Sequence, residues 1–262
     1  MRVSIVIPAY NEEERIGNTL NEYGRFFKDL KNQGILDFEI VIVINCSTDK
    51  TEEIVKKYSK EYKEIVYFVL KEKGKGLAII EGFKDALTRN NDLIGFVDAD
   101  LATGPEAFYD LARRIKTSDV AIASRYVKGA VVHPKQTPKR ILMSRVFNIL
   151  VRTLFFMPYR DTQCGAKLIK RHALERTIDE LKITQWAIDI NILYALRKKD
   201  FRIKEIPTVW SDKSGSKINW KRTSLGMAFA VIRLRIINSP FRRFLKPMKM
   251  FVGKLWRAIG LP

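Results

Sequence analysis

The chain has 262 residues, 46% of them hydrophobic, and a formal net charge of +19, so it can bury a substantial core as one domain with or without an appendage. Its two cysteines, Cys46 and Cys164, are too few for a disulfide framework and suit a reducing compartment. The sequence predicts no secretory signal and, with no uncharged apolar stretch of about 18 residues, no transmembrane helix.

The first half of the chain predicts alternating strands and helices. Continuous apolar, β-branched runs predict strands buried on both faces at residues 3–8, 38–44, 64–70, 92–98 and 119–125. Amphipathic patterns between them predict helices at about residues 13–31, 51–62, 75–90 and 105–116. This repetition predicts an α/β fold with a right-handed, mostly parallel sheet flanked by helices.

The second half is less regular. It predicts a helix at residues 139–156, a strand at 165–170, a helix near 188–198 and short strands at 201–207 and 208–210. From Ser224 onward the pattern is helical and is divided by Pro240 and Pro247.

Positive charge gathers in two segments. Residues 213–262 contain twelve Lys or Arg and no acid, whereas the rest of the chain carries 36 basic and 29 acidic residues. Residues 120–160 also lack acids and include Arg125, Arg140 and Arg145. Such asymmetry favours a polyanionic partner, either nucleic acid or an anionic membrane surface, over an ordinary solvated basic surface.

Two carboxylates, Asp98 and Asp100, stand where the fourth predicted strand ends. Carboxylates at i and i+2 on a turn can share a hard divalent cation that also binds a diphosphate. The alternative is a pair of capping carboxylates before the helix that begins at Pro105. Ligands of open α/β sheets bind beyond the carboxyl ends of the strands, and this position favours the metal site.

Three further loops fall at the same predicted edge. They are "PAYNEEE" (Pro8–Glu14), "NCSTDKT" (Asn45–Thr51) and "KEKGKGLA" (Lys71–Ala78), in which Gly74 and Gly76 permit close approach of a ligand to the backbone. Four consecutive strand ends therefore carry polar or glycine-rich loops, which predicts one binding site along this edge.

These segments carry a resemblance. "VIPAYNEEERI", "STDKT", "KGKGLAIIEGF" and "FVDADLATGPE" resemble the family 2 inverting glycosyltransferases with the GT-A fold. "ASRYVKGA", "RILMSRVFNIL", "YRDTQCGAKLIKR", "QWAIDINILYAL" and "EIPTVWSDKSGSKI" resemble the polyprenyl-phosphate glycosyltransferases, and "DTQCGAKL" with the "W…SGSK" ending is more similar to the dolichyl-phosphate glucosyltransferases than to the mannosyltransferases. The resemblance covers about Met1 to Ile218.

The resemblance implies roles for matching residues. The donor nucleotide sugar would lie against Pro8, Tyr10, Glu12, Asn45, Lys75, Ala99, Asp161 and Gln163. Asp98 and Asp100 would hold Mg²⁺ or Mn²⁺ on the donor diphosphate. The acceptor phosphate and the leaving diphosphate would be gathered by Arg125, Arg140, Ser144 and Lys217.

Two positions depart from the family pattern. Ile44-Asn45-Cys46 stands where the family usually has paired acids, so the contact to the base or ribose is altered. Ala102 stands where related mannosyltransferases have a Gln that helps to bind metal. The second departure leaves Asp98 and Asp100 without a third protein ligand of that kind.

The expected chemistry needs no general base. A phosphate acceptor is already anionic at neutral pH, so positioning and charge neutralisation would carry the reaction. The chain has only His133 and His172, and it shows no nucleophile and base pair that would form a covalent intermediate. A single attack predicts inversion of the anomeric centre.

We expect a glycosyltransferase domain at residues 1–220 and a basic amphipathic helical tail at 221–262. Phe241, Phe244, Phe251 and Trp256 recur at helical spacing among basic residues. Such a helix can lie in the plane of an anionic bilayer, which predicts a peripheral enzyme on the cytoplasmic face of a membrane. Packing of the tail on the domain and an oligomer contact are the alternatives.

Three other functions remain open from the sequence. One is transfer of mannose from GDP-mannose to the same lipid, and another is a catalytically inactive scaffold. The third is a basic nucleic-acid-binding module, although no helix-turn-helix, zinc or RNA-recognition signature supports a nucleic-acid partner. A gel-shift assay with nucleic acid, compared with liposome flotation, would separate a nucleic-acid-binding module from a membrane enzyme.

Overall fold

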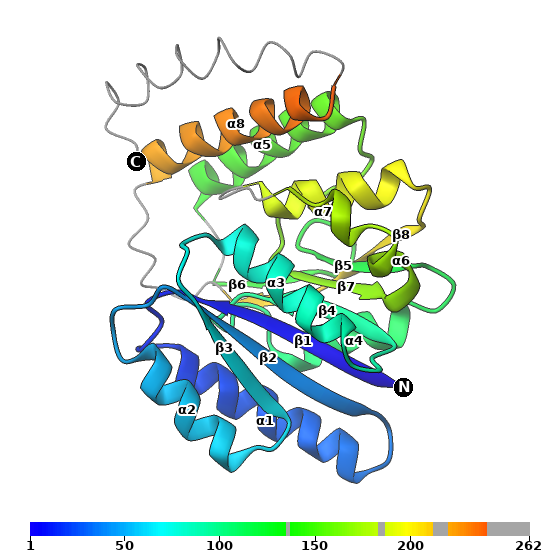
Figure 1. Cartoon of the computed structure of the whole chain (residues 1–262). Helices are drawn as coiled ribbons and strands as arrows, with labels where there is room; N and C mark the ends of the chain where they lie inside the picture. Colours follow the sequence, from blue (N-terminus) through cyan, green and yellow to red (C-terminus); the bar gives the residue numbers. More distant parts are fainter. Residues whose placement is uncertain (135–136, 183–186, 212–219, 240–262) are drawn as a thin grey trace.

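The first half of the chain alternates strands and helices as predicted. The computed structural model describes residues 1–134, 137–182, 187–211 and 220–239 (Figure 1). Its strands are β1 (Arg2–Ala9), β2 (Asp37–Asn45), β3 (Ile65–Leu70), β4 (Leu93–Val97) and β5 (Val120–Ser124). The helices between them are α1 (Ile16–Asn32), α2 (Thr51–Glu61), α3 (Lys75–Leu87) and α4 (Pro105–Arg114).

The second half mixes helices with short strands. It contains β6 (Val131–His133), α5 (Pro138–Phe155), β7 (Ala166–Lys170), α6 (Arg171–Glu175), a 3₁₀ turn (Ile178–Glu180), α7 (Ile188–Lys198), β8 (Ile203–Pro207), β9 (Val209–Ser211) and α8 (Trp220–Ile237). The sequence did not predict β6 or α6. The expected helical tail begins earlier than Ser224, and its part after Ser239 lies outside the described residues.

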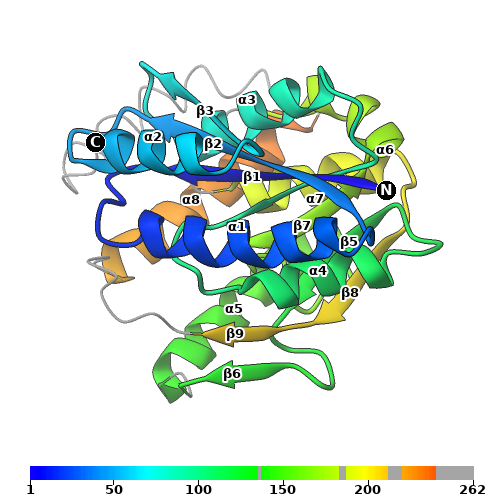
Figure 2. The same cartoon turned by 90° about the horizontal axis from the view of Figure 1, so that it is seen from below.

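The main sheet has the strand order β3-β2-β1-β4-β7-β5-β8. Pairs β1–β2, β1–β4, β2–β3 and β5–β8 are parallel, whereas β7 runs antiparallel to both β4 and β5. The amino end of β7 therefore lies at the edge where the parallel strands end. A second small sheet joins β6 and β9 in parallel (Figure 2).

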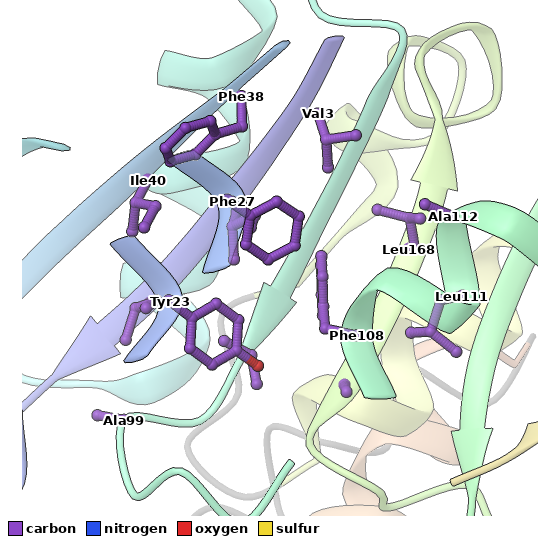
Figure 3. Packing of buried hydrophobic residues seen from close by; sticks show 14 of the residues in the cluster. Val3, Tyr23, Phe27, Phe38, Ile40, Ala99, Phe108, Leu111, Ala112 and Leu168 are labelled. Carbon is purple, nitrogen blue, oxygen red and sulfur yellow. The ribbon is translucent and has the colours of Figure 1, made fainter. Parts of the chain in front are cut away.

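Helices cover both faces of the sheet, and each face buries its own cluster. Ile5 and Ile7 of β1 belong to one cluster and Val6 to the other, because successive side chains of a strand point to opposite faces. On the first face, Phe27 of α1 lies 6.4 Å from Phe108 of α4 between ring centroids (Figure 3). Burial of each such ring stabilises the fold by about 1.5–3 kcal/mol, so the sheet is a rigid support for the loops at its edge.

None of the helices in the described ranges is both long enough and apolar enough to cross a membrane.

Candidate active site

The site lies along the edge where the parallel strands end and β7 begins. Asp98 directly follows β4, and its backbone N–H donates to the carbonyl of Gly165 at 3.2 Å, just before β7. Arg125 directly follows β5, and Asn45 is the last residue of β2. Residues far apart in the sequence thus meet at one edge, which is where a sheet of this kind binds ligands.

The Asp98 carboxylate pairs with the first residue of α3. The Nζ atom of Lys75 lies 2.5 Å from Oδ1 of Asp98. Close packing around the ammonium lowers the pKa of Lys75, but the Asp98 carboxylate, with Asp189 and Asp100 nearby, outweighs this and raises that pKa above its usual value. Lys75 therefore stays cationic beside the two aspartates, where a bound diphosphate would need positive charge.

Gly165 leaves room for the Asp98 carboxylate. A Cβ atom built at position 165 would lie 2.0 Å from Oδ2 and 2.6 Å from Cγ of Asp98. Any side chain there would force the carboxylate to move. The glycine in "DTQCGAKL" therefore determines where Asp98 can lie.

Asp100 sits in a tight turn that leaves carboxylate oxygens for a cation. Its Oδ1 accepts the backbone N–H of Ala102 at 3.0 Å. Magnesium-type ions are commonly held by one or two carboxylates together with substrate phosphates, and Asp98 with Asp100 provides that number and kind of ligand. Among the described residues, no group of three or more His, Cys, Asp or Glu side chains is placed to hold a metal ion.

Two side chains of α1 form hydrogen bonds to the backbone of the turn that contains Asp100. The hydroxyl of Thr19 donates to the carbonyl of Ala99 at 2.7 Å, and that of Tyr23 donates to the carbonyl of Thr103 at 2.8 Å. Burial raises the pKa of Tyr23 well above its usual value, so the phenol keeps its proton. The turn that carries Ala99 and Asp100 is therefore anchored to a helix of the core.

The loops after β1 and β2 are joined by side-chain hydrogen bonds. The backbone N–H of Glu12 donates to Thr51 Oγ1 at 2.8 Å. The Glu12 carboxylate accepts hydrogen bonds from Nε and Nη2 of Arg15 at 2.7 and 2.9 Å. Burial raises the pKa of Glu12, Arg15 lowers it, and Asp100 and Asp98 raise it further, with a net rise. Glu12 thus belongs to the same electrostatic cluster as the two aspartates.

Asn45 and Tyr10 occupy different positions at this edge. Asn45 is buried, and its Oδ1 accepts the backbone N–H of Gly74 at 3.0 Å. Tyr10 is exposed, with Nζ of Lys73 4.1 Å from its ring centroid. Pro8 lies half-buried within β1. Tyr10 thus presents its ring at the surface with the Lys73 ammonium beside it, whereas Asn45 fixes the loop that carries Gly74.

Arg125 and Asp161 form a buried bidentate ion pair. Nε and Nη2 of Arg125 lie 2.8 and 3.0 Å from the two carboxylate oxygens, and the backbone N–H of Arg125 donates to Oδ2 at 3.0 Å. Burial raises the pKa of Asp161, but Arg125 holds it below its usual value. The backbone N–H of Gln163 donates to Asp161 Oδ1 at 3.3 Å, so this pair also orders the segment before β7.

The predicted acceptor residues are only partly within the described structure. Ser144 on α5 shares a hydrogen bond of 2.8 Å with the hydroxyl of Tyr126, which places α5 beside the loop that follows β5. The side chain of Arg140, also on α5, lies outside the described part of the chain, as does Lys217. The roles predicted for the site residues all stay predictions.

Two charged residues of the site were missed by the sequence reasoning. Lys167 on β7 is completely buried, and its Nζ donates to the carbonyl of Cys164 at 2.8 Å and pairs with Asp189 of α7. Both lie within segments that carry the family resemblance, which was the available signal. Because a buried lysine needs a partner, this pair ties α7 to the segment next to Asp98.

Comparison with known proteins gives a consistent result. Residues 4–178 match the family described as Glycosyl transferase family 2. The chain is 32% identical over 244 residues to a dolichyl-phosphate beta-glucosyltransferase of Dictyostelium discoideum, covering 89% of this chain and 73% of the relative. It is 30% identical over 254 residues to the human dolichyl-phosphate beta-glucosyltransferase, covering 92% and 78%.

Among solved structures, the chain is similar in fold to glucosyl-3-phosphoglycerate synthase from Mycobacterium tuberculosis in complex with Mn²⁺, uridine-diphosphate and glucosyl-3-phosphoglycerate. The TM-score is 0.61 at 18% identity, covering 89% of this chain and 78% of that chain. This similarity confirms the predicted α/β fold.

Proposed function

The chain belongs to glycosyl transferase family 2, and we propose that it transfers glucose from UDP-glucose to a polyprenyl phosphate such as dolichyl phosphate. The observation that carries the proposal is the similarity to dolichyl-phosphate beta-glucosyltransferases along about nine-tenths of the chain. The Asp98–Lys75 pair at the sheet edge, with Asp100 two residues along the chain, supports it, because carboxylates can hold a divalent cation on a nucleotide diphosphate and a lysine adds fixed positive charge.

In this proposal the donor lies across the ends of β1, β2 and β4. The exposed ring of Tyr10 would stack on the base. Glu12 and Asn45 would order the loops that form the nucleotide site. Asp98 and Asp100 would hold Mg²⁺ or Mn²⁺, which supplies Lewis-acid charge to the diphosphate when bound.

Lys75 would contribute a second positive charge to the diphosphate. Its ammonium lies 2.5 Å from Asp98, so it is within reach of any group bound to that carboxylate. As UDP departs, negative charge grows on its terminal phosphate, and a fixed cation stabilises that charge more in the transition state than in the substrate. Lys75 would therefore raise the rate as well as the affinity for the donor.

The acceptor would approach from the side of β5 and α5. Its phosphate oxygen attacks the anomeric carbon of glucose, the bond from that carbon to the UDP oxygen breaks, and the configuration inverts. The oxygen is already anionic, so no side chain needs to take a proton. Arg140, Ser144 and Lys217 are the proposed phosphate ligands, with Arg125 contributing through its paired guanidinium.

Asp161 and Gln163 are proposed to lie near the sugar. Asp161 is held by Arg125, and Gln163 follows it in the segment that leads to Gly165. We also propose that residues 1–220 form the catalytic domain and that residues 221–262 associate with the cytoplasmic face of a membrane, where the acceptor lipid resides.

A donor panel tests this proposal. The purified chain is given a short polyprenyl phosphate, Mg²⁺ or Mn²⁺, and labelled UDP-glucose, GDP-mannose or UDP-GlcNAc in separate reactions. We expect label in the lipid only from UDP-glucose. Label from GDP-mannose alone would make the chain a mannosyltransferase, and efficient transfer to free polyprenol would contradict the phosphate acceptor.

A further inference from the structure

The loop between β3 and α3 leads directly to the cation of the site. Lys71, Glu72 and Lys73 are exposed, whereas Gly74 is buried and precedes Lys75, the first residue of α3. A helix commonly begins at a side chain that accepts one of its free backbone N–H groups, but a glycine at that place has no side chain to offer. The start of α3, and with it Lys75, therefore depends on contacts from elsewhere in the fold.

Asn45, the last residue of β2, supplies such a contact. Its side chain is 3% exposed, and Oδ1 accepts the backbone N–H of Gly74 at 3.0 Å. The next residue, Cys46, donates its backbone N–H to the carbonyl of Leu70 at 3.1 Å. Two adjacent residues thus hold both ends of the loop. Because a buried backbone N–H needs an acceptor, loss of the Asn45 oxygen would release the end that leads into α3.

The middle of α3 is already fixed on the sheet by close packing. A Cβ atom built at Gly82 would lie 2.4 Å from Cγ1 of Val6 and 3.0 Å from Cγ2 of Val43, so helix and sheet are in direct contact there. Figure 1 shows α3 lying along β1. Lys75 is seven residues before Gly82, and helix ends fray where they lack partners. The first turn therefore needs the hydrogen bond from Asn45 in addition to this packing.

The position of this first turn determines where the Lys75 ammonium can lie. Nζ is 2.5 Å from Oδ1 of Asp98, and the Lys75 side chain is 39% exposed, so the ammonium can also meet a bound ligand. A lysine carries its charge on a flexible stem of four carbons, so the backbone from which the stem starts must be fixed if the charge is to be fixed.

We infer that Asn45 is a positioning residue: it holds Gly74 and so places the Lys75 ammonium against the donor diphosphate, and it does not act by binding the base or ribose. The inference rests on the proposed function for the diphosphate. It also accounts for the uncharged side chain at the end of β2. The fold needs one buried oxygen acceptor there, and an amide provides it without the cost of burying a charge.

Binding of UDP and UMP to the full chain tests the inference, because only UDP carries a second phosphate. The variant Asn45→Leu keeps the size of the side chain and removes its oxygen. In competition calorimetry with Mg²⁺, we expect this variant to bind UDP about tenfold more weakly and UMP within about twofold of the unmodified chain. Equal weakening of both nucleotides would place Asn45 against the nucleoside and overturn the inference. Unchanged UDP affinity, or an unmodified chain that binds UDP no more tightly than UMP, would also overturn it.

A double-variant cycle tests whether Asn45 acts through Lys75. Lys75→Met alone should weaken UDP binding about tenfold, and adding Asn45→Leu should weaken it by less than about twofold more. Independent effects would multiply to about a hundredfold loss, and that result would contradict the inference.

A conservative variant tests the role of the oxygen itself. Asn45→Asp retains an acceptor for the Gly74 N–H, so it should bind UDP within about threefold of the unmodified chain. A loss as large as that of Asn45→Leu would overturn the inference.

Asn91→Leu is the matched control for the loss of a buried asparagine. Asn91 is 1% exposed and lies before β4, at the opposite edge of the sheet, where Nδ2 donates to Oε1 of Glu39 and to the carbonyl of Ala86 at 2.9 and 2.8 Å. This variant should unfold at a lower temperature and bind both nucleotides normally. A loss of UDP affinity equal to that of Asn45→Leu would show a general loosening of the fold and contradict the inference. UDP binding without glucose transfer by the unmodified chain would refute the proposed function, and the comparison of UDP with UMP would still decide the inference.

Discussion

Replacing Gly165 by Ala should damage the site while leaving the fold largely intact. The added Cβ would lie 2.0 Å from Oδ2 of Asp98, whereas a comfortable contact between carbon and oxygen is about 3.4 Å, so the carboxylate must move by more than about 1 Å. The Asp98 side chain is 35% exposed and can swing outward, so the stability cost should be about 1 kcal/mol. A displacement of that size at reacting groups can cost about a hundredfold in rate.

The assay is kcat/KM for glucose transfer from UDP-glucose to a short polyprenyl phosphate, with thermal unfolding measured in parallel. Gly104→Ala is the matched control, since its Cβ would meet only the flexible end of Glu106 at 3.4 Å in a neighbouring turn. We expect about a hundredfold loss for Gly165→Ala and less than about threefold for the control. Unchanged kcat/KM in Gly165→Ala, with a normal unfolding temperature, would refute the view that this glycine sets the position of Asp98.

Three further predictions concern charged pairs of the site. Lys75→Met should weaken UDP-glucose binding about tenfold in calorimetry, because the diphosphate loses a cation, and unchanged affinity would contradict this. Lys167→Met should lower the free energy of unfolding by about 3–5 kcal/mol in urea, since Asp189 loses its buried partner, and a cost below about 1 kcal/mol would refute that role. Folding lowers the pKa of Asp161. The stabilisation from its pair with Arg125 should therefore be present above the unfolded-state pKa of about 4 and be lost as the pH falls below that value. The variant Asp161→Asn should remove this acid dependence from denaturation curves.

The fold was largely predictable because its strands are buried on both faces. Continuous apolar runs gave every parallel strand of the first half within a few residues, and amphipathic patterns gave the helices between them. The order of the strands in the sheet was harder to predict from the sequence. The antiparallel insertion of β7 between β4 and β5 depends on long-range packing, and the local pattern of residues 165–170 carries no information about a partner strand.

The same limit applies to the site. Asp98 and Asp100 could be selected as candidate site residues because two acids at the end of an apolar strand contradict the local pattern. The dependence of Asp98 on Gly165 could not, because it arises only when β7 lies beside β4. The burial of Lys167 could not be predicted either, because a single lysine in a short strand ordinarily points to solvent. Its partner, Asp189, lies on α7, far along the sequence.

The central claim is that the paired aspartates at the sheet edge support glucose transfer to a lipid phosphate. The most direct measurement is the time course of labelled glucose entering a short polyprenyl phosphate, for the unmodified chain and for Asp100→Ala at equal concentration with Mg²⁺ or Mn²⁺. We predict steady incorporation by the unmodified chain and a loss of at least about a hundredfold in the variant, which should still unfold cooperatively. Equal incorporation by the two proteins, or no incorporation by the unmodified chain, would contradict the claim.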